Sequence, residues 1–178
     1  AEEFLARLTV EVKQLRVGDP LDPDVTTGPV VSAYAQQSII GGINRAVDGG
    51  ARVVATAEAP QSGYYVQPTV LELPSSTELW FEELFGPVLA VQRAATTADA
   101  FRLANEGEFG LSAALFTQDL TSALAGVDDL DVGILHVNSE SAGADPHVPF
   151  GGAKRSGYGP KEQGDAAREF FTHTTTVY

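Results

Sequence analysis

The chain has 178 residues, of which 43% are hydrophobic and 20% charged, and its formal net charge is −13 at pH 7. This composition is that of a folded globular protein with one domain, or one domain and an appendage. The acidic excess disfavours nucleic acid or an anionic membrane as a partner, because both recruit clustered Lys and Arg. No apolar run approaches the ~20 residues of a membrane helix. The absence of cysteine excludes disulfides, thiolate metal sites and a thiol nucleophile within this chain.

The first half of the chain is predicted to contain two helices and two extended segments. Apolar residues at helical spacing favour a helix from Ala1 to about Arg16. Ser32 is a suitable N-cap for a second helix, which ends at Gly49-Gly50. The apolar face expected for this second helix comprises Val31, Ala35, Ile39, Ile43 and Val47. Val53 and Val54 predict a short strand, and residues 63–70 predict an extended, partly exposed segment.

The second half alternates strands and helices. Compact apolar runs predict strands at 87–91, 111–117 and 133–137. Between them, Thr96 and Asp119 are suitable N-caps for two helices, and Asp99 completes a capping box with Thr96. This order favours right-handed crossovers and a mostly parallel sheet with flanking helices, which is an α/β fold. A glycine-rich loop, a helix over about 161–170 and a β-branched tail complete the chain.

The loop Glu82-Glu83-Leu84-Phe85-Gly86-Pro87-Val88 places a carboxylate, an aromatic ring and a rigid turn close together. A carboxylate such as that of Glu83 can accept hydrogen bonds from both hydroxyls of a ribose. A ring such as that of Phe85 can lie against a flat heterocycle. The alternative is a surface Glu and a core Phe beside a turn, and the spacing alone favours this alternative.

A second candidate loop follows the strand that ends near Asn138. Ligands bind beyond the carboxyl ends of the strands in parallel sheets, so this loop is a candidate site. The turn Pro149-Phe150-Gly151-Gly152 exposes an aromatic ring, and the alternative here is a glycine-rich loop with a buried Phe. The histidines are scattered singly, which predicts no zinc site. They are His136, His147 and His173.

Together, in this order and at this separation, the segments 82–88 and 149–157 resemble the C-terminal portion of the aldehyde dehydrogenase superfamily. Further matches to the family follow in order: Val17 to Asp22, Gly28-Pro29, Pro68 to Val70, Ala104-Asn105 with Gly110-Leu111, and Thr117 to Leu120. The resemblance covers essentially the whole chain. It implies part of a catalytic domain over residues 1–170 and a C-terminal oligomerisation strand over residues 171–178.

The resemblance also implies a reaction, the NAD- or NADP-dependent oxidation of an aldehyde to a carboxylate. In this family a cysteine thiolate adds to the carbonyl, hydride passes to the nicotinamide, and water hydrolyses the resulting thioester. The nucleophilic cysteine, the general-base glutamate and the dinucleotide-binding domain all lie upstream of the matching region. We therefore expect this chain to be inactive alone, with neither a catalytic nucleophile nor a metal site of its own.

The family motifs assign roles to residues of this chain. Glu83 would hold the nicotinamide ribose and Phe85 would position the nicotinamide ring, with Glu82 as a structural neighbour. Asn138 and Phe150 would lie at the substrate end of the active-site tunnel.

The downstream matches imply supporting roles. Lys154, Ser156 and Gly157 would fix the glycine-rich loop rather than react. Lys161-Glu162 resembles a basic-Glu pair of the family, in which the Glu162 carboxylate would relay protons near the site. The alternative for Glu162 is an exposed Glu in the first turn of a helix.

The implied partners are a small aldehyde substrate and further copies of the chain, in a cytoplasmic dimer or tetramer. A narrower resemblance, in residues 134–144, 161–164 and 170–172, is to the branch that acts on α-ketoglutaric semialdehyde. The alternative from another class is a cysteine-less, non-enzymatic module that keeps the same fold for oligomerisation or partner binding.

Overall fold

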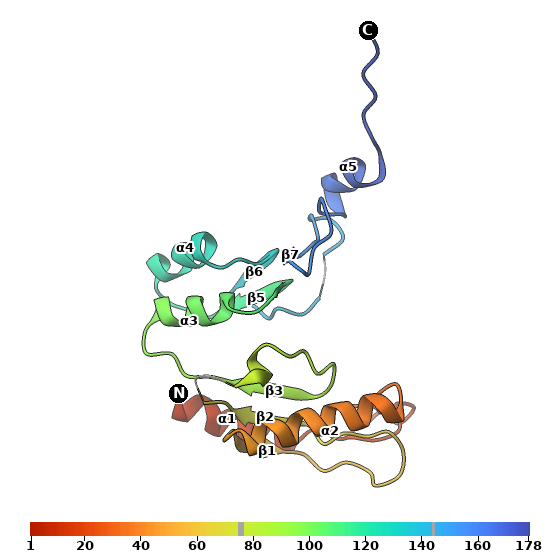
Figure 1. Ribbon diagram of the computed structural model, residues 1–178, viewed down its shortest axis with the longest axis vertical. Helices are drawn as coiled ribbons and strands as arrows, with labels where there is room; N and C mark the ends of the chain where they lie inside the picture. The colour runs from red at the N-terminus through yellow and green to blue at the C-terminus, as the bar shows by residue number, and fades with distance from the viewer. Residues whose placement is uncertain (75–76, 144) are drawn as a thin grey trace. The chain divides into compact units, whose positions relative to one another are not determined.

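The computed structural model describes residues 1–74, 77–143 and 145–178. The chain divides into two compact units, Ala1–Arg93 and Ala94–Tyr178, each with its own strands and helices (Figure 1). Ala144, which belongs to the narrower resemblance noted above, lies outside the described residues.

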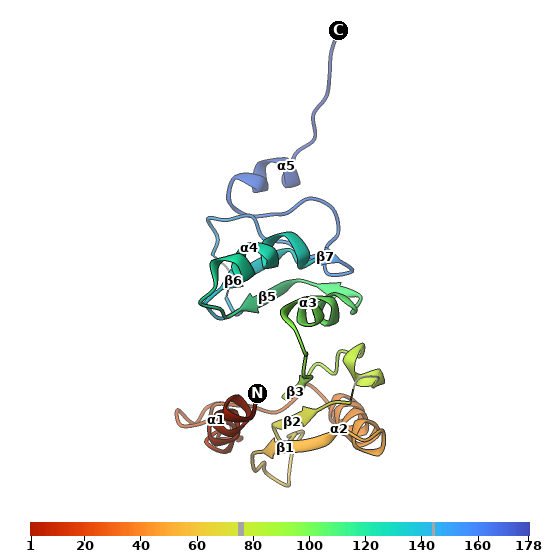
Figure 2. The same ribbon diagram turned by 90° about the vertical axis from the view of Figure 1, so that its left-hand side faces the viewer.

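The first unit is a three-stranded sheet between two helices. Its elements are α1 (Glu2–Lys13), α2 (Ala33–Asp48), β1 (Arg52–Thr56), β2 (Thr69–Glu72), the 3-10 helix η1 (Glu78–Trp80) and β3 (Val88–Val91). The strand order is β1-β2-β3, with β1 antiparallel and β3 parallel to the central strand. Figure 2 shows α1 and α2 on opposite sides of this sheet.

The central strand β2 is buried on both faces, because successive side chains of a strand point in opposite directions. Val70 packs with Val12 of α1 on one face. Leu71, which is fully buried, packs with Ala46 of α2 on the other face. An uninterrupted apolar run is typical of a strand that is covered by helices on both sides. The unit is therefore a three-layer α/β structure.

Helix α2 begins at the predicted cap, since Oγ of Ser32 accepts a hydrogen bond from the backbone N–H of Ala35 at 3.2 Å. Its buried face differs from the prediction, because Val31 is 92% exposed and Val47 is 40% exposed. The buried residues of the helix are Ile39, Gly42 and Ala46. A stripe with a constant spacing of four drifts around a helix of about 3.6 residues per turn, whereas these three residues stay on one face.

The second unit consists of short strands and helices. Its elements are α3 (Thr97–Asn105), β4 (Phe109–Gly110), β5 (Ser112–Leu115), α4 (Leu120–Asp129), β6 (Ile134–Val137), β7 (Ala153–Lys154), the 3-10 helix η2 (Gly164–Ala166) and α5 (Ala167–Phe171). β5 and β6 are parallel, whereas β4 and β7 are antiparallel. The predicted caps are confirmed, because Thr96 accepts a hydrogen bond from Asp99 N, and the Asp119 carboxylate accepts one from Ser122 N.

The α/β fold class is confirmed, and within each unit antiparallel pairs occur beside the parallel ones. β3 pairs with β2 in the first unit, and β5 pairs with β6 in the second. The central strand β2 needs hydrogen-bond partners on both edges, because its backbone is buried between helices. β1 and β3 supply these partners, and the sheet of the first unit is therefore mixed.

The helix predicted over 161–170 is shorter in the structure and starts with η2 at Gly164. Gln163, the residue before η2, has a φ of +68°, which a right-handed helix does not allow. Helix α1 likewise ends at Lys13, before Arg16. Residues 172–178, predicted to be strand, form no helix or strand within the chain.

Candidate active-site segments

Glu83 and Phe85 lie in the loop between η1 and β3, on the surface of the first unit. Phe85 is 86% exposed, which excludes the core Phe of the alternative interpretation. Its backbone is left-handed, with φ of +52°, a conformation that non-glycine residues seldom adopt. Glu83 is exposed and takes part in no hydrogen bond or ion pair among the described residues. The loop borders a surface concavity of about 300 Å³ that is lined by residues between Leu79 and Ala90.

Helix α2 holds this loop through two close apolar contacts. Leu84 packs against Gly42, where an added Cβ would lie 2.5 Å from Cδ2 of the leucine. Ile39 packs against Gly86, where an added Cβ would lie 2.5 Å from Cδ1 of the isoleucine. At both positions a larger residue would have to displace the end of the leucine or isoleucine side chain, so the glycines allow a close approach between helix and loop.

Glu82 is directed towards the same helix. Its two carboxylate oxygens accept hydrogen bonds from Nη2 of Arg45, at 2.8 and 2.9 Å. Glu82 is thus the structural neighbour that the family resemblance predicts, while the adjacent carboxylate of Glu83 stays unpaired among the described residues. Sequence reasoning missed Arg45, because its partner lies 37 positions away and no local pattern links the two.

Asn138 directly follows β6 and also has a left-handed backbone, with φ of +56°. Its side-chain Oδ1 accepts a hydrogen bond from Thr117 N, and its Nδ2 donates one to Thr117 O, both at 2.9 Å. Thr117 lies just beyond β5, so the Asn138 amide joins the carboxyl ends of the two parallel strands. The residue therefore orients the loop that begins there, and its contact with a substrate stays a prediction.

The structure brings Phe150 and Glu162 together. The backbone N–H of Phe150 donates to Glu162 O at 2.6 Å, and that of Glu162 donates to Phe150 O at 2.9 Å, in an antiparallel bridge. Residues directly opposite each other in an antiparallel pair carry their side chains on the same face. Glu162 precedes the helix, so the alternative of a glutamate in the first helical turn is wrong.

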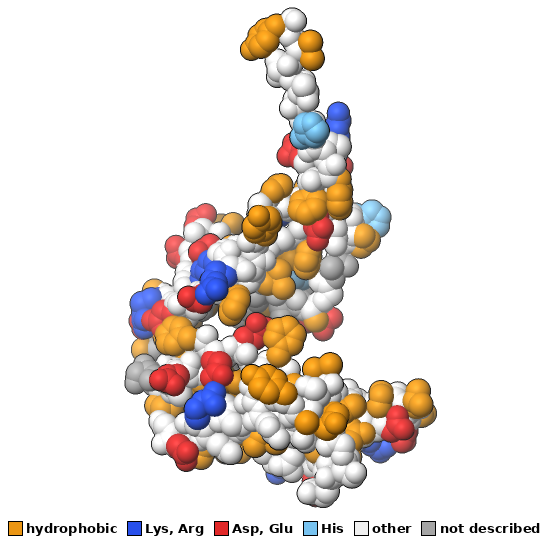
Figure 3. All heavy atoms as spheres, turned by 45° about the vertical axis from the view of Figure 1, so that its right-hand side comes forward, with side chains coloured by type: hydrophobic (Ala, Val, Ile, Leu, Met, Phe, Trp, Pro, Cys, Tyr) orange, Lys and Arg blue, Asp and Glu red, His pale blue; other side chains and the backbone are white. Residues whose placement is uncertain are grey.

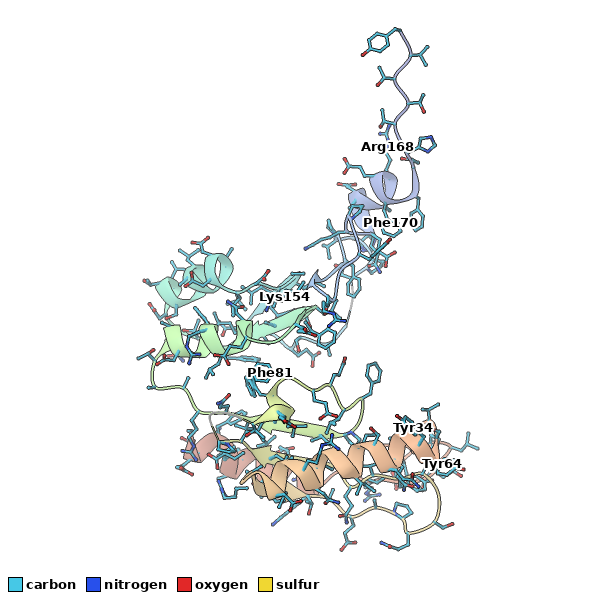
Figure 4. All side chains as sticks on the ribbon, viewed as in Figure 1. Tyr34, Tyr64, Phe81, Lys154, Arg168 and Phe170 are labelled. Carbon is cyan, nitrogen blue, oxygen red and sulfur yellow. The ribbon has the colours of Figure 1, made fainter. Side chains whose placement is uncertain are left out.

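The glycine-rich loop is anchored to the end of α3. Nζ of Lys154 donates hydrogen bonds to Asn105 O at 2.7 Å and Gly107 O at 3.1 Å, where carbonyl groups at a helix C-terminus favour a cation. The backbone N–H of Gly110 donates to Oγ of Ser156 at 3.1 Å. Figure 4 marks Lys154 within the second unit. These contacts confirm that Lys154 and Ser156 fix the loop.

The loop between Asn138 and Phe150 contains a carboxylate that accepts two hydrogen bonds. Oδ1 of Asp145 lies 2.9 Å from both the backbone N and Nδ1 of His147. The hydrogen bonds from the backbone and the side chain of His147 hold the pKa of Asp145 below its ordinary value.

No other site type emerges from the described part of the chain. Within residues 1–74, 77–143 and 145–178, no group of three or more His, Cys, Asp or Glu could hold a metal ion. None of the described helices is long and apolar enough to cross a membrane. The candidate residues fall into two groups, since Glu83 and Phe85 belong to the first unit and Asn138, Phe150 and Glu162 to the second.

The loops at residues 82–88 and 149–157 lie on an α/β framework, and together they indicate the class of protein. The chain matches the aldehyde dehydrogenase family over residues 1–177. Because this match spans nearly the whole chain, the protein belongs to the aldehyde dehydrogenase family, and the resemblance noted in its sequence is confirmed.

Particular relatives are similar over the whole chain but are much longer. The chain is 36% identical to α-ketoglutaric semialdehyde dehydrogenase from Bacillus subtilis and 42% identical to betaine aldehyde dehydrogenase from Cereibacter sphaeroides. Each alignment covers 99% of this chain, but 38% and 37% of the respective relative. A solved aldehyde dehydrogenase from Mycobacterium tuberculosis, complexed with NAD+, is 33% identical with a TM-score of 0.87, over 97% of this chain and 36% of that one. The chain thus spans little more than a third of the length of these relatives.

Proposed function

We propose that this chain is the C-terminal part of an NAD- or NADP-dependent aldehyde dehydrogenase, in which it contributes the contact to the nicotinamide ribose and part of the substrate wall. The observation that carries the proposal is the presentation of Glu83 and Phe85, two exposed side chains beside a concavity of about 300 Å³. The chain aligns with only 38% and 37% of the length of the two relatives, which supports the proposal that it is one portion of a longer enzyme.

Glu83 and Phe85 fit a nicotinamide nucleotide in chemistry and in accessibility. The Glu83 carboxylate has no competing partner among the described residues, so it is available to accept hydrogen bonds from both ribose hydroxyls. The ring of Phe85 is free to lie against the nicotinamide, and its constrained backbone limits the directions in which that ring points. When bound, the nicotinamide accepts a hydride from the substrate.

In the second unit, Phe150 would form part of the substrate wall, with Asn138 at the same end of the site. Glu162 would take up a proton from the water that releases the product. The net reaction converts an aldehyde, water and the oxidised nucleotide into a carboxylate, the reduced nucleotide and two protons. The chain contains no cysteine, so the nucleophilic thiolate must come from the upstream part of the enzyme.

Exposed apolar surface in the second unit supports the same proposal. Leu120, Leu124 and Val127 lie along one side of α4 and are 72%, 58% and 64% exposed. Hydrophobic side chains are visible at the surface in Figure 3. An apolar stripe of this kind is normally covered by another element, and the upstream part of the enzyme is the proposed cover.

The aldehyde, the assembly and the compartment are finer parts of the proposal. The names of the two relatives make α-ketoglutaric semialdehyde and betaine aldehyde the first substrates to test. The family resemblance supports a cytoplasmic homo-oligomer, a dimer or a tetramer, with the tail at residues 171–178 as a subunit contact.

Assays of the 178-residue chain and of the complete enzyme, with NAD, NADP and a panel of aldehydes, test the proposal. We expect turnover from the complete enzyme and none from the chain alone, because the chain has no group that can form the thioester. Cofactor-dependent turnover by the purified chain would refute the thiol mechanism. A reading frame without a cysteine upstream of Ala1, or a complete product that binds no nicotinamide nucleotide, would favour the non-enzymatic module for oligomerisation or partner binding.

A further inference from the structure

The loop at residues 82–86 contacts α2 through every second residue. Gly86 meets Ile39, and Leu84 meets Gly42. Glu82 forms an ion pair with Arg45 at 2.8 Å. The three helix positions are spaced three apart, so they follow one another along one side of α2.

The intervening loop residues point away from the helix. Residues 82, 84 and 86 contact α2, whereas Glu83 and Phe85 between them are exposed. The contacts on α2 therefore determine the direction in which both candidate cofactor-binding side chains project.

The three contacts are not equivalent. The two apolar contacts fix the loop at Leu84 and Gly86, on either side of Phe85. On the N-terminal side of Glu83, the ion pair between Arg45 and Glu82 is the contact nearest to Glu83, and the buried Leu79 of η1 belongs to the same apolar cluster as Ala46 of α2. Its side chains are 56% and 40% exposed, so the pair contributes little to global stability. Its effect is local, on the loop.

We propose that Arg45 is a positioning residue, which fixes Glu82 against α2 and thereby directs the Glu83 carboxylate towards the nicotinamide ribose. The inference rests on the function proposed above. It adds a residue of α2 that would not touch the cofactor but would set the geometry of the residue that does.

Hydrogen exchange on the 178-residue chain tests the structural half of the proposal without any activity. Arg45→Ala should raise the exchange rates of the hydrogen-bonded amides of Glu82 and Val88, which donate to Leu79 O and Gly86 O, by roughly two- to fivefold, the size expected for loss of an exposed ion pair, and leave β1 and β2 unchanged. Arg7→Ala, which removes the exposed ion pair with Glu3 on α1, is the matched control and should not affect this loop. Unchanged exchange at Glu82 and Val88 in Arg45→Ala would overturn the proposal.

The functional half is tested in the complete enzyme. Arg45→Ala should raise the KM for the nicotinamide nucleotide by about two- to fivefold and leave the KM for the aldehyde unchanged. Arg45→Lys should recover part of the loss, and the reversed pair Arg45→Glu with Glu82→Arg should recover more than either single reversal. An equal rise in the KM for the nucleotide and the KM for the aldehyde would overturn the positioning role. So would a reversed pair that recovers no more than the single reversals.

The two proposals fail in different ways. If the unmodified complete enzyme neither binds a nicotinamide nucleotide nor oxidises an aldehyde, the proposed function is wrong. If the unmodified enzyme does both and Arg45→Ala has the same nucleotide KM, the enzyme assignment stands and the role of Arg45 is wrong.

Discussion

Phe150 and Glu162 exchange both of their backbone hydrogen bonds, at 2.6 and 2.9 Å, although they are separated by the whole glycine-rich loop. This bridge places an aromatic ring and a carboxylate on the same face of the pair. The position of the proposed proton relay is therefore coupled to that of the proposed substrate wall through the backbone rather than through side chains.

Replacing Glu162 with Gln in the complete enzyme should slow turnover by roughly 10- to 100-fold, because an amide cannot accept the proton that general-base catalysis requires. The KM for the nicotinamide nucleotide should stay the same, since Glu162 is not a proposed contact of the cofactor. Steady-state kinetics measure both values. Glu140→Gln, which removes an exposed carboxylate from the preceding loop, is the control, and equal rates in the two variants would exclude a relay at Glu162.

Local signals in the sequence predicted the beginnings of helices correctly. Ser32, Thr96 and Asp119 each cap a helix as expected, because a cap is decided by one side chain and a backbone N–H two or three residues later. The roles of Lys154 and Ser156 in fixing the loop were also predicted, although from the family resemblance rather than from a local signal.

The structural features that could not be predicted from the sequence depend on long-range contacts. The helix predicted over about 161–170 included Glu162, but the bridge of Glu162 to Phe150 competes with helical hydrogen bonds, and the helix begins at Gly164. The ion pair between Arg45 and Glu82 spans 37 positions, and strand β3 pairs with β2. Each of these outcomes depends on which distant segments pack together, which one sequence does not reveal.

Replacing Glu83 with Gln tests the ribose contact in the complete enzyme. The amide keeps the size of the side chain but loses the charge that strengthens hydrogen bonds to hydroxyls. We expect hydride transfer to slow by about tenfold, which corresponds to ~1.4 kcal/mol of transition-state stabilisation, with a smaller effect on the KM for the aldehyde. Single-turnover kinetics measure the step. Glu78→Gln, at an exposed position of η1, should behave as wild type. Unchanged hydride transfer in Glu83→Gln would leave Glu83 with a structural role only.

Lys154→Met should destabilise the second unit, because it removes the two hydrogen bonds to Asn105 O and Gly107 O. Hydrogen bonds from a charged group contribute about 1.5–3 kcal/mol, and the variant should lose stability of that order. Urea denaturation measures the loss, and hydrogen exchange at 105–110 locates it. Lys13→Met, which removes an exposed lysine without a hydrogen bond among the described residues, should have a much smaller effect. Equal losses in both variants would contradict the anchoring role.

The first unit should become less stable in acid through the charge network around Arg93. Hydrogen bonds from Arg93 hold the pKa of Glu72 and of Glu2 below the ordinary value, and Arg52 lowers the pKa of Glu72 further. Both carboxylates bind protons less readily in the folded than in the unfolded chain. Their stabilisation is therefore complete above the unfolded pKa of about 4.3 and is lost as the pH falls through the lower folded values.

Arg93→Gln provides the test of this network. Wild type should be more stable than the variant at pH 7, and the difference should shrink by pH 3 and in high salt, which screens exposed charges. Urea midpoints for both proteins at the two pH values measure the effect. A difference that is the same at pH 7 and pH 3 would show that the carboxylates are not its source.

The tail at residues 172–178 should form a contact between subunits. It is rich in β-branched residues, which favour strands, yet it pairs with no strand among the described residues, and Val177 and Tyr178 are fully or nearly fully exposed. An unpaired extended segment invites pairing with another chain. Deleting residues 172–178 should therefore lower the oligomeric state of the complete enzyme in sedimentation.

Replacing Thr174 and Thr176 with Pro keeps the length of the tail but removes two backbone donors. This variant should have the same effect as the deletion if the contact is a strand pairing. Identical sedimentation of the intact, truncated and proline-substituted proteins would assign the tail to a frayed terminus.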